Sequence, residues 1–253
     1  MTTSNVSFVK SVDVNVCGGC FSPRVAPQEE LRVFLDRELT AFNNSEPAGS
    51  GRAPHLFYLV KGRKQVNIGR RLLEPAVARN DSDLLSVRRQ VEYRNKRRYE
   101  VTYRPWVRPI SKLEAVDLLD PSKRTAFYGL EVSIPMPDGG IEHVVQKIQA
   151  APVVPHLGVH IAPDGAFHLR YFLSQSSNNF ELKLLVEQAI TANLGGNANN
   201  VGEGTASLPV PGTKTFDATG HQTGAAELWT SDVSDFYSLE GVHELFMELE
   251  EEA

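Results

Sequence analysis

The feature that most restricts the fold of this chain is an alternation of side-chain type between residues 87 and 104. Large apolar or aromatic side chains occupy odd positions, namely Val87, Val91, Tyr93, Tyr99, Val101 and Tyr103. Basic side chains occupy even positions, namely Arg88, Arg94, Lys96, Arg98 and Arg104. Successive side chains of a strand point to opposite faces, so this pattern predicts two strands, roughly 85–94 and 97–104, that turn near residues 95–96. A helix is the competing interpretation, because several of these residues are tolerable helix formers.

Other segments also indicate antiparallel hairpins. The basic tetrapeptide 61–64 separates two short apolar segments and predicts a hairpin with a basic tip. Two Pro-Asp-Gly sequences are strong turn signals, each between two apolar segments. The first predicts strands at 127–134 and 141–148, and the second predicts strands at 153–161 and 166–173.

Other segments predict helices, among them a short one from the capping-box pattern at Ser111 through Leu119. Pro27 and the acids after it open an N-terminal helix, and Asn179 caps a second helix at 179–194. The C-terminal residues predict an acidic amphipathic helix. We therefore expect an α+β, β-rich fold in which antiparallel hairpins form a sheet or barrel. The expected organisation is a single globular domain at 1–194 with basic hairpins at 61–108, a flexible loop rich in Gly, Asn and Thr at 195–225, and an acidic tail at 226–253.

Charge is distributed very unevenly along the chain. The segment from Lys61 to Lys112 has 15 basic and five acidic residues, whereas the formal net charge of the whole chain is −5. Aromatic residues are interleaved with these cations. Rings that stack on bases, beside cations that neutralise phosphates, are typical of surfaces that bind single-stranded nucleic acid.

The pattern thus predicts RNA or single-stranded DNA as the partner. We expect a non-enzymatic, self-associating nucleic-acid-binding protein, most simply one for single-stranded RNA, with a nucleocapsid-, movement-protein- or silencing-suppressor-like role. The candidate binding residues are Lys61, Arg63, Lys64, Arg70, Arg71, Arg88, Arg94, Lys96, Arg97, Arg98, Tyr99, Tyr103, Arg104 and Trp106.

The tail after Lys214 has ten acids and no lysine or arginine. Val242, Leu245, Phe246 and Leu249 form an apolar stripe at helical spacing. The tail could pack on its own domain, or it could act as an arm that docks on a neighbouring subunit or covers the basic surface. A structural oligomer held together by the basic face and the acidic tail is therefore one alternative function.

Two further patterns suggest metal chemistry. Cys17 and Cys20 form half of a zinc site, which His156 and His160 could complete. Pro163-Asp164 followed by Glu181-Leu182-Lys183 resembles the PD-(D/E)xK motif of a large nuclease superfamily. This resemblance implies an Mg²⁺-dependent nuclease in which Asp164 and Glu181 hold the metal and Lys183 activates water. It also implies that Glu181 and Lys183 lie on a strand.

The chain has no apolar run of the length of a membrane span and no signal-peptide pattern at its N-terminus. Its only two cysteines do not form a disulfide framework. These observations predict a cytoplasmic or nuclear protein that is not secreted.

Overall fold

The computed structural model describes residues 21–22, 25–46, 52–60, 81–109, 126–136, 140–162, 165–198, 208–217 and 219–251. Its helices are α1 (Glu30–Ser45), α2 (Asp81–Lys96), α3 (Gly140–Ala150), α4 (Phe180–Asn193) and α5 (Leu239–Glu251). Its strands are β1 (Phe21–Ser22), β2 (Arg52–Val60), β3 (Glu100–Pro109), β4 (Ala126–Ile134), β5 (Leu157–Ala162), β6 (Phe167–Ser177), β7 (Leu208–Pro209), β8 (Lys214–Phe216) and β9 (Gln222–Ser231).

All nine strands belong to one sheet, and every pair of neighbouring strands in it is antiparallel. The strand order is β1-β9-β5-β6-β4-β3-β2, with β7 added on β3 and β8 on β9. The two ends of this order do not pair with each other, so the sheet is open. The expected α+β, β-rich fold is confirmed, including its N-terminal helix, the helix near 179–194 and the C-terminal acidic helix. The barrel alternative is wrong.

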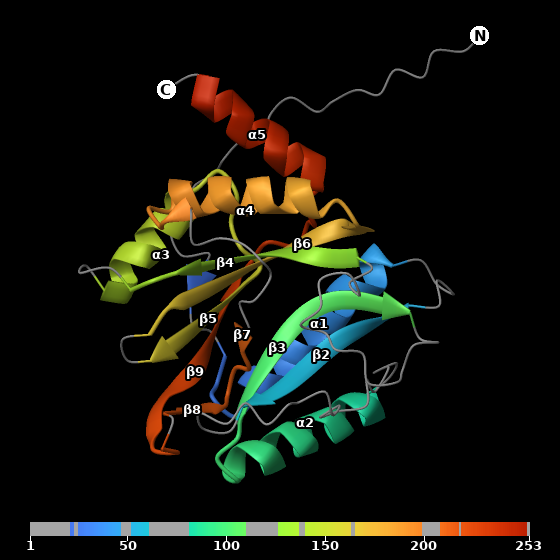
Figure 1. Cartoon of the computed structure of the whole chain (residues 1–253), viewed down its shortest axis with the longest axis vertical. Coiled ribbons are helices and arrows are strands. Elements are labelled where there is room, and N and C mark those ends of the chain that lie inside the picture. Colours follow the sequence, from blue (N-terminus) through green and yellow to red (C-terminus); the bar gives the residue numbers. More distant parts are fainter. Residues whose placement is uncertain are drawn as a thin grey trace.

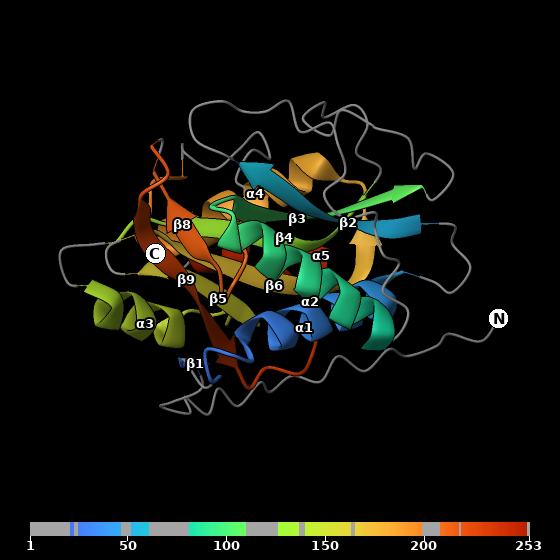
Figure 2. The ribbon, with the colours of Figure 1, turned by 90° about the horizontal axis from the view of Figure 1, so that it is seen from below.

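Helices cover both faces of the sheet. Figure 1 shows α3, α4 and α5 on one side and α1 and α2 on the other, and Figure 2 shows α1 and α2 in front of the sheet when it is viewed from below. One apolar core, which includes Phe34 and Phe42 of α1, lies between α1 and the sheet. The other, which includes Val186 of α4 and Phe246 of α5, lies on the opposite face. The two cores fix the sheet between two helical layers.

Two of the predicted strands are helices. Residues 85–94 belong to α2, in which Val91 and Asn95 are buried one helical turn apart, so the buried positions follow the helical period. Residues 141–148 lie in α3, where Val144 and Ile148 are likewise buried four residues apart. Alternating residue types were mistaken for a strand in α2, and apolar residues after a turn signal were mistaken for a strand in α3. Strands β5 and β6 overlap the two strands predicted around the second Pro-Asp-Gly sequence, although β5 begins at Leu157 and not at residue 153. The short helix predicted at 111–119 lies outside the described residues.

The segment predicted as a flexible loop, 195–225, contains β7, β8 and the start of β9. Val210, Thr213 and Thr215 are buried there. Small and polar residues were interpreted as a loop, but hydrogen bonds to the edge of β9 organise them: the backbone N–H of Gly212 donates to the carbonyl of Ala226, and that of Ala226 to Thr213. Among the described residues, no helix is long and apolar enough to cross a membrane.

Candidate nucleic-acid interface

The outer surface of α2 combines cations with an exposed ring. Arg89, Tyr93, Lys96 and Arg97 are all exposed, and their spacing of three, four and eight residues keeps them on one side of the helix axis. Val91 and Asn95 occupy the opposite, buried side. From residue 88 to residue 98 the sequence has six basic residues and one acid, Glu92. We call Arg89, Tyr93, Lys96, Arg97 and Arg98 the α2 surface.

Tyr93 and Arg97 are stacked on this surface. The guanidinium carbon of Arg97 lies 4.3 Å from the centroid of the Tyr93 ring, and that of Arg94 lies 5.9 Å from it. Half of Tyr93 is exposed to solvent. Glu92 is occupied by Arg88, whose Nε donates to its carboxylate over 2.8 Å. Within the part of the chain that the structure describes, no acid forms an ion pair with the α2 surface, so its positive charge is available to a ligand.

The end of α2 places an arginine in an unusual backbone conformation. The N–H of Tyr99 donates to the carbonyl of Arg94, and the N–H of Arg98 donates to that of Asn95, which is the Schellman pattern of helix termination. Arg98 occupies the left-handed position with φ 63°, where glycine is normally favoured. It is exposed. The backbone of Arg98 thus adopts a conformation that is costly for a residue with a Cβ atom.

The structure brings together only part of the predicted interface. Arg88, Arg94, Lys96, Arg97, Arg98 and Tyr99 lie on α2 or directly after it. Tyr103, Arg104 and Trp106 lie on β3, where the structure describes the backbone and not their side chains. Lys61, Arg63, Lys64, Arg70 and Arg71 lie outside the described residues. Arg89 and Tyr93 were missed as site residues, although a helical wheel of 85–97 places both beside Arg97.

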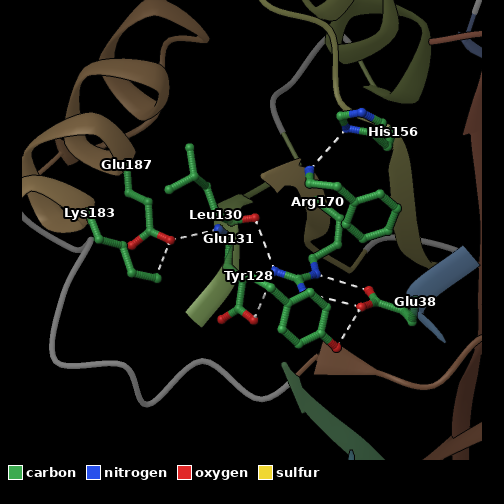
Figure 3. A network of polar contacts seen from close by, with 9 residues as sticks. Glu38, Tyr128, Leu130, Glu131, His156, Arg170, Lys183 and Glu187 are labelled. Atoms are coloured by element: carbon green, nitrogen blue, oxygen red, sulfur yellow. Dashed lines mark hydrogen bonds and ion pairs between the residues drawn. The ribbon is translucent and has the colours of Figure 1, made fainter. Parts of the chain in front are cut away.

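A second group of charged residues is buried between the helical layers (Figure 3). Nε and Nη2 of Arg170 on β6 donate to the two carboxylate oxygens of Glu38 on α1, over 2.9 and 3.2 Å. The Tyr128 hydroxyl donates to the same carboxylate over 3.1 Å. Arg170 also lies 5.3 Å from the centroid of the Tyr128 ring. These contacts tie α1 to the two central strands.

The network continues through β4 to α4. Glu131 lies 3.6 Å from Arg170 Nη1, and its backbone N–H donates to Glu187 over 2.6 Å. Glu187 is also paired with Lys183 of the same helix. Burial raises the pKa of Glu131 to about 7, against the opposing effects of Arg170 and Lys183. Because these buried groups are paired with one another, we assign the network to the joining of the two layers.

Of the predicted zinc ligands, His156 and His160 lie within the described residues, His156 directly before β5 and His160 within it. Nδ1 of His156 accepts from the backbone N–H of Phe172, and its Nε2 lies 3.0 Å from the carbonyl of Asp235, to which it donates. Both nitrogens are therefore engaged, and burial lowers the pKa of His156 to about 4. Among the described residues no group of three or more His, Cys, Asp or Glu side chains is placed to bind a metal. Cys17 and Cys20 lie outside those residues.

The strand that the nuclease resemblance requires is a helix. Glu181 and Lys183 lie in the first turn of α4, two residues apart, so they point to different sides of the helix. Glu181 is exposed, whereas Lys183 is buried and paired with Glu187. Asp164 lies outside the described residues. The strand implied by the nuclease resemblance is therefore absent at 180–184, because the capping bond from the Leu182 N–H to Asn179 starts the helix that was predicted there.

The acidic tail helix packs on its own domain. Leu239, Val242 and Phe246 of α5 are buried in the core that includes α4. Figures 1 and 2 place α5 on the side of the sheet opposite α2. In this arrangement the described part of the tail does not cover the α2 surface of the same molecule.

Two solved structures resemble this fold. The AEP domain of the primase-polymerase (PrimPol) of cyanophage S-2L has 9% identity and a TM-score of 0.48, with 90% of this chain and 99% of that chain covered. The primase RepB′ has 10% identity and a TM-score of 0.45, and the match covers 90% of this chain and 65% of that chain. No protein-family model and no curated protein matches the sequence.

The printed names of both structures are those of enzymes, so they give no support to the interpretation of the chain as a non-enzymatic binding protein, and that interpretation is withdrawn. That interpretation rested on the cluster of basic residues, which is easy to recognise in the sequence. No catalytic motif of comparable strength was recognised. At these identities and TM-scores the likeness concerns the path of the backbone. It transfers neither an activity nor a catalytic residue to this chain.

Proposed function

We propose that this protein binds single-stranded nucleic acid through the α2 surface. The observation that carries the proposal is the guanidinium of Arg97, which is stacked 4.3 Å from the half-exposed ring of Tyr93. A stacked ring and cation offer an aromatic face to a base and a fixed positive charge to the neighbouring phosphate. Arg89 and Lys96 extend the positive charge along the same side of the helix.

Two details favour a ligand over a merely solvated helix end. Cations near a helix C-terminus are stabilised by the helix dipole, but this effect fades within the last turn, and Arg89 lies about two turns from the end of α2. Arg98 is kept in a left-handed conformation that other residues adopt more easily. A polyanion that contacts both residues accounts for both details.

Fluorescence-anisotropy titrations test the proposal with labelled single-stranded DNA, single-stranded RNA and duplex DNA at several salt concentrations. The affinity falls as the salt concentration rises. In the double variant Arg89→Gln, Arg97→Gln the plot of log affinity against log salt should become less steep, by about 0.7 for each phosphate contact that is lost. Tyr93→Leu should weaken binding by about 1–3 kcal/mol, whereas Tyr93→Phe keeps the ring and should bind as the parent does.

Lys147→Gln is the matched control, because it removes a cation from α3 on the opposite face of the sheet. It should leave the affinity and the salt slope unchanged. Absence of binding by the parent overturns the proposed function. Equal effects of Tyr93→Leu and Tyr93→Phe overturn the role of the ring, and equal effects of the control and the α2 variants overturn the site.

The same mixtures are incubated with Mg²⁺ and nucleoside triphosphates, because a binding surface does not decide whether a reaction follows. The two similar structures are named as a primase-polymerase and a primase, so an extended strand is the first product to look for. Extension of the labelled strand identifies a polymerising enzyme, and shortening identifies a nuclease. The α2 variants should reduce either reaction in proportion to their loss of binding.

A further inference from the structure

The side chain of Asn95 joins the end of α2 to β8. Its Nδ2 donates to the backbone carbonyl of Lys214 over 2.9 Å, and the N–H of Lys214 donates to its Oδ1 over 3.0 Å. Nδ2 also donates to the carbonyl of Tyr99 over 3.2 Å. The carboxamide thus reproduces the two hydrogen bonds of a neighbouring strand and holds Lys214 directly beside the turn that contains Arg98. Figures 1 and 2 show the end of α2 next to β8.

Lys214 is the one basic residue of β8, and it points away from the core. It is exposed, whereas the next residue, Thr215, is buried. No ion pair involves Lys214 among the described residues. Its backbone N–H and C=O groups are both bonded to Asn95, and on the other side of the strand Lys214 lies opposite Ala225 in the pairing of β8 with β9. A cation on an anchored backbone is therefore placed next to the α2 surface, 116 residues after Arg98 in the sequence.

The hairpin beyond Lys214 has the opposite charge. Asp217 accepts hydrogen bonds from the backbone N–H groups of Thr219 and His221 and from the Thr219 hydroxyl. These bonds lower the pKa of Asp217 to about 2, so its carboxylate stays ionised at neutral pH. A phosphate backbone is attracted as far as Lys214 and repelled at the hairpin tip.

We propose that Lys214 continues the nucleic-acid track of the α2 surface onto β8, and that Asn95 is the positioning residue that holds it there. This inference rests on the proposed function, because it names where the same strand leaves the α2 surface. A bound strand passes the Tyr93–Arg97 stack, follows Arg98 and contacts Lys214 with a phosphate. Asp217 marks the end of the track.

A double-mutant cycle on the full chain tests this inference with single-stranded DNA of increasing length. Lys214→Gln should lower the salt slope by about 0.7 for long strands and leave the affinity of the shortest bound strands unchanged. Asn95→Ala should also weaken binding of long strands. When Asn95 is already alanine, Lys214→Gln should have no further effect, because the cation is no longer held in place. If Asn95 only stabilised the fold, the effects of Asn95→Ala and Lys214→Gln on affinity would simply add in the double variant.

Asn95→Ala removes buried hydrogen bonds, so circular dichroism and thermal melting are recorded for every variant. Asp217→Asn on the exposed hairpin is a second measurement that does not depend on the stability of α2, and it should tighten binding of long strands at low salt. Lys147→Gln again serves as the control. If the parent binds but Lys214→Gln and Asp217→Asn both behave as the parent at every length, the track is wrong. If the parent does not bind, the proposed function itself fails.

Discussion

Arg170 and Glu38, 132 residues apart in the sequence, form a two-point ion pair in which both side chains are only 1% exposed. A buried pair of this kind contributes little net stability compared with apolar residues, but removing one partner leaves an uncompensated charge. We therefore expect Glu38→Ala to lower the free energy of unfolding by about 3–5 kcal/mol. The Tyr128 hydroxyl loses its acceptor in the same variant.

Glu29→Ala provides the matched control, because Glu29 forms an ion pair with Arg32 over 2.6 Å on the exposed surface of the same region. Exposed pairs contribute no more than about 1 kcal/mol. Chemical denaturation of both variants measures the difference. Similar losses in the two variants would contradict the assignment of Glu38 and Arg170 to the joining of the layers.

The second prediction concerns pH. The pKa of Glu131 is raised from its ordinary value to about 7 by burial, so the folded protein binds more protons than the unfolded chain between about pH 4.5 and 7. The contribution of Glu131 to stability is thus highest below this window and is lost as pH rises through it. Burial lowers the pKa values of His156 and His168 to about 4, so their contributions change with pH in the opposite direction.

Because these effects oppose each other, the test is a difference between two proteins. Glu131→Gln cannot ionise, and its stability relative to the parent should increase by about 3 kcal/mol between pH 4 and pH 8. Urea denaturation across this range measures the difference. If the difference in free energy of unfolding between the two proteins stayed constant across this pH range, the pKa of Glu131 would be the same in the folded and the unfolded protein.

The sequence predicted the elements that carry strong local signals. The capping side chain of Asn179 accepts from the Leu182 N–H as its position suggested, and β5 and β6 flank a genuine turn signal. Helix α2 was assigned to strands because its residues suit both structures. The choice is decided by contacts outside the segment, such as the hydrogen bonds of Asn95 to Lys214, which lies 119 residues away.

The types of residue that form the candidate site were predicted, but only some of their positions were. A cluster of cations and aromatic rings can be recognised from the sequence alone. The stack of Tyr93 on Arg97, in contrast, requires the residues to be one helical turn apart, and this segment was predicted to form strands. The buried network was missed because nothing local selects Glu38 from 31 acids as the partner of Arg170. A usable signal was present, since Arg170 is a lone cation between apolar residues of a predicted strand and must have a partner when buried.

Gly129 leaves room for the guanidinium of Arg170, whose Nη1 donates to the carbonyl of Leu130 over 3.4 Å. A Cβ atom at position 129 would lie 2.7 Å from Nη1 of Arg170 and 2.8 Å from the carbonyl oxygen of Tyr171. Gly129→Ala should therefore destabilise the fold by about 1–3 kcal/mol, because the guanidinium or the strand must move. Gly241→Ala on α5 is the control, since its Cβ would meet nothing closer than 3.5 Å and alanine favours the helix. Thermal melting that ranks the two variants in the reverse order would refute the explanation.

The last prediction separates stability from binding at one residue. Arg98 has a φ of 63°, a conformation that costs an L-residue about 1–2 kcal/mol and glycine almost nothing. Arg98→Gly should raise the free energy of unfolding while it weakens binding to single-stranded nucleic acid, because one phosphate contact is lost. Arg98→Lys keeps both the charge and the strained backbone, so it should resemble the parent in both measurements. A glycine variant that binds as tightly as the parent would remove Arg98 from the interface, and one that is less stable would show that the arginine stabilises the turn.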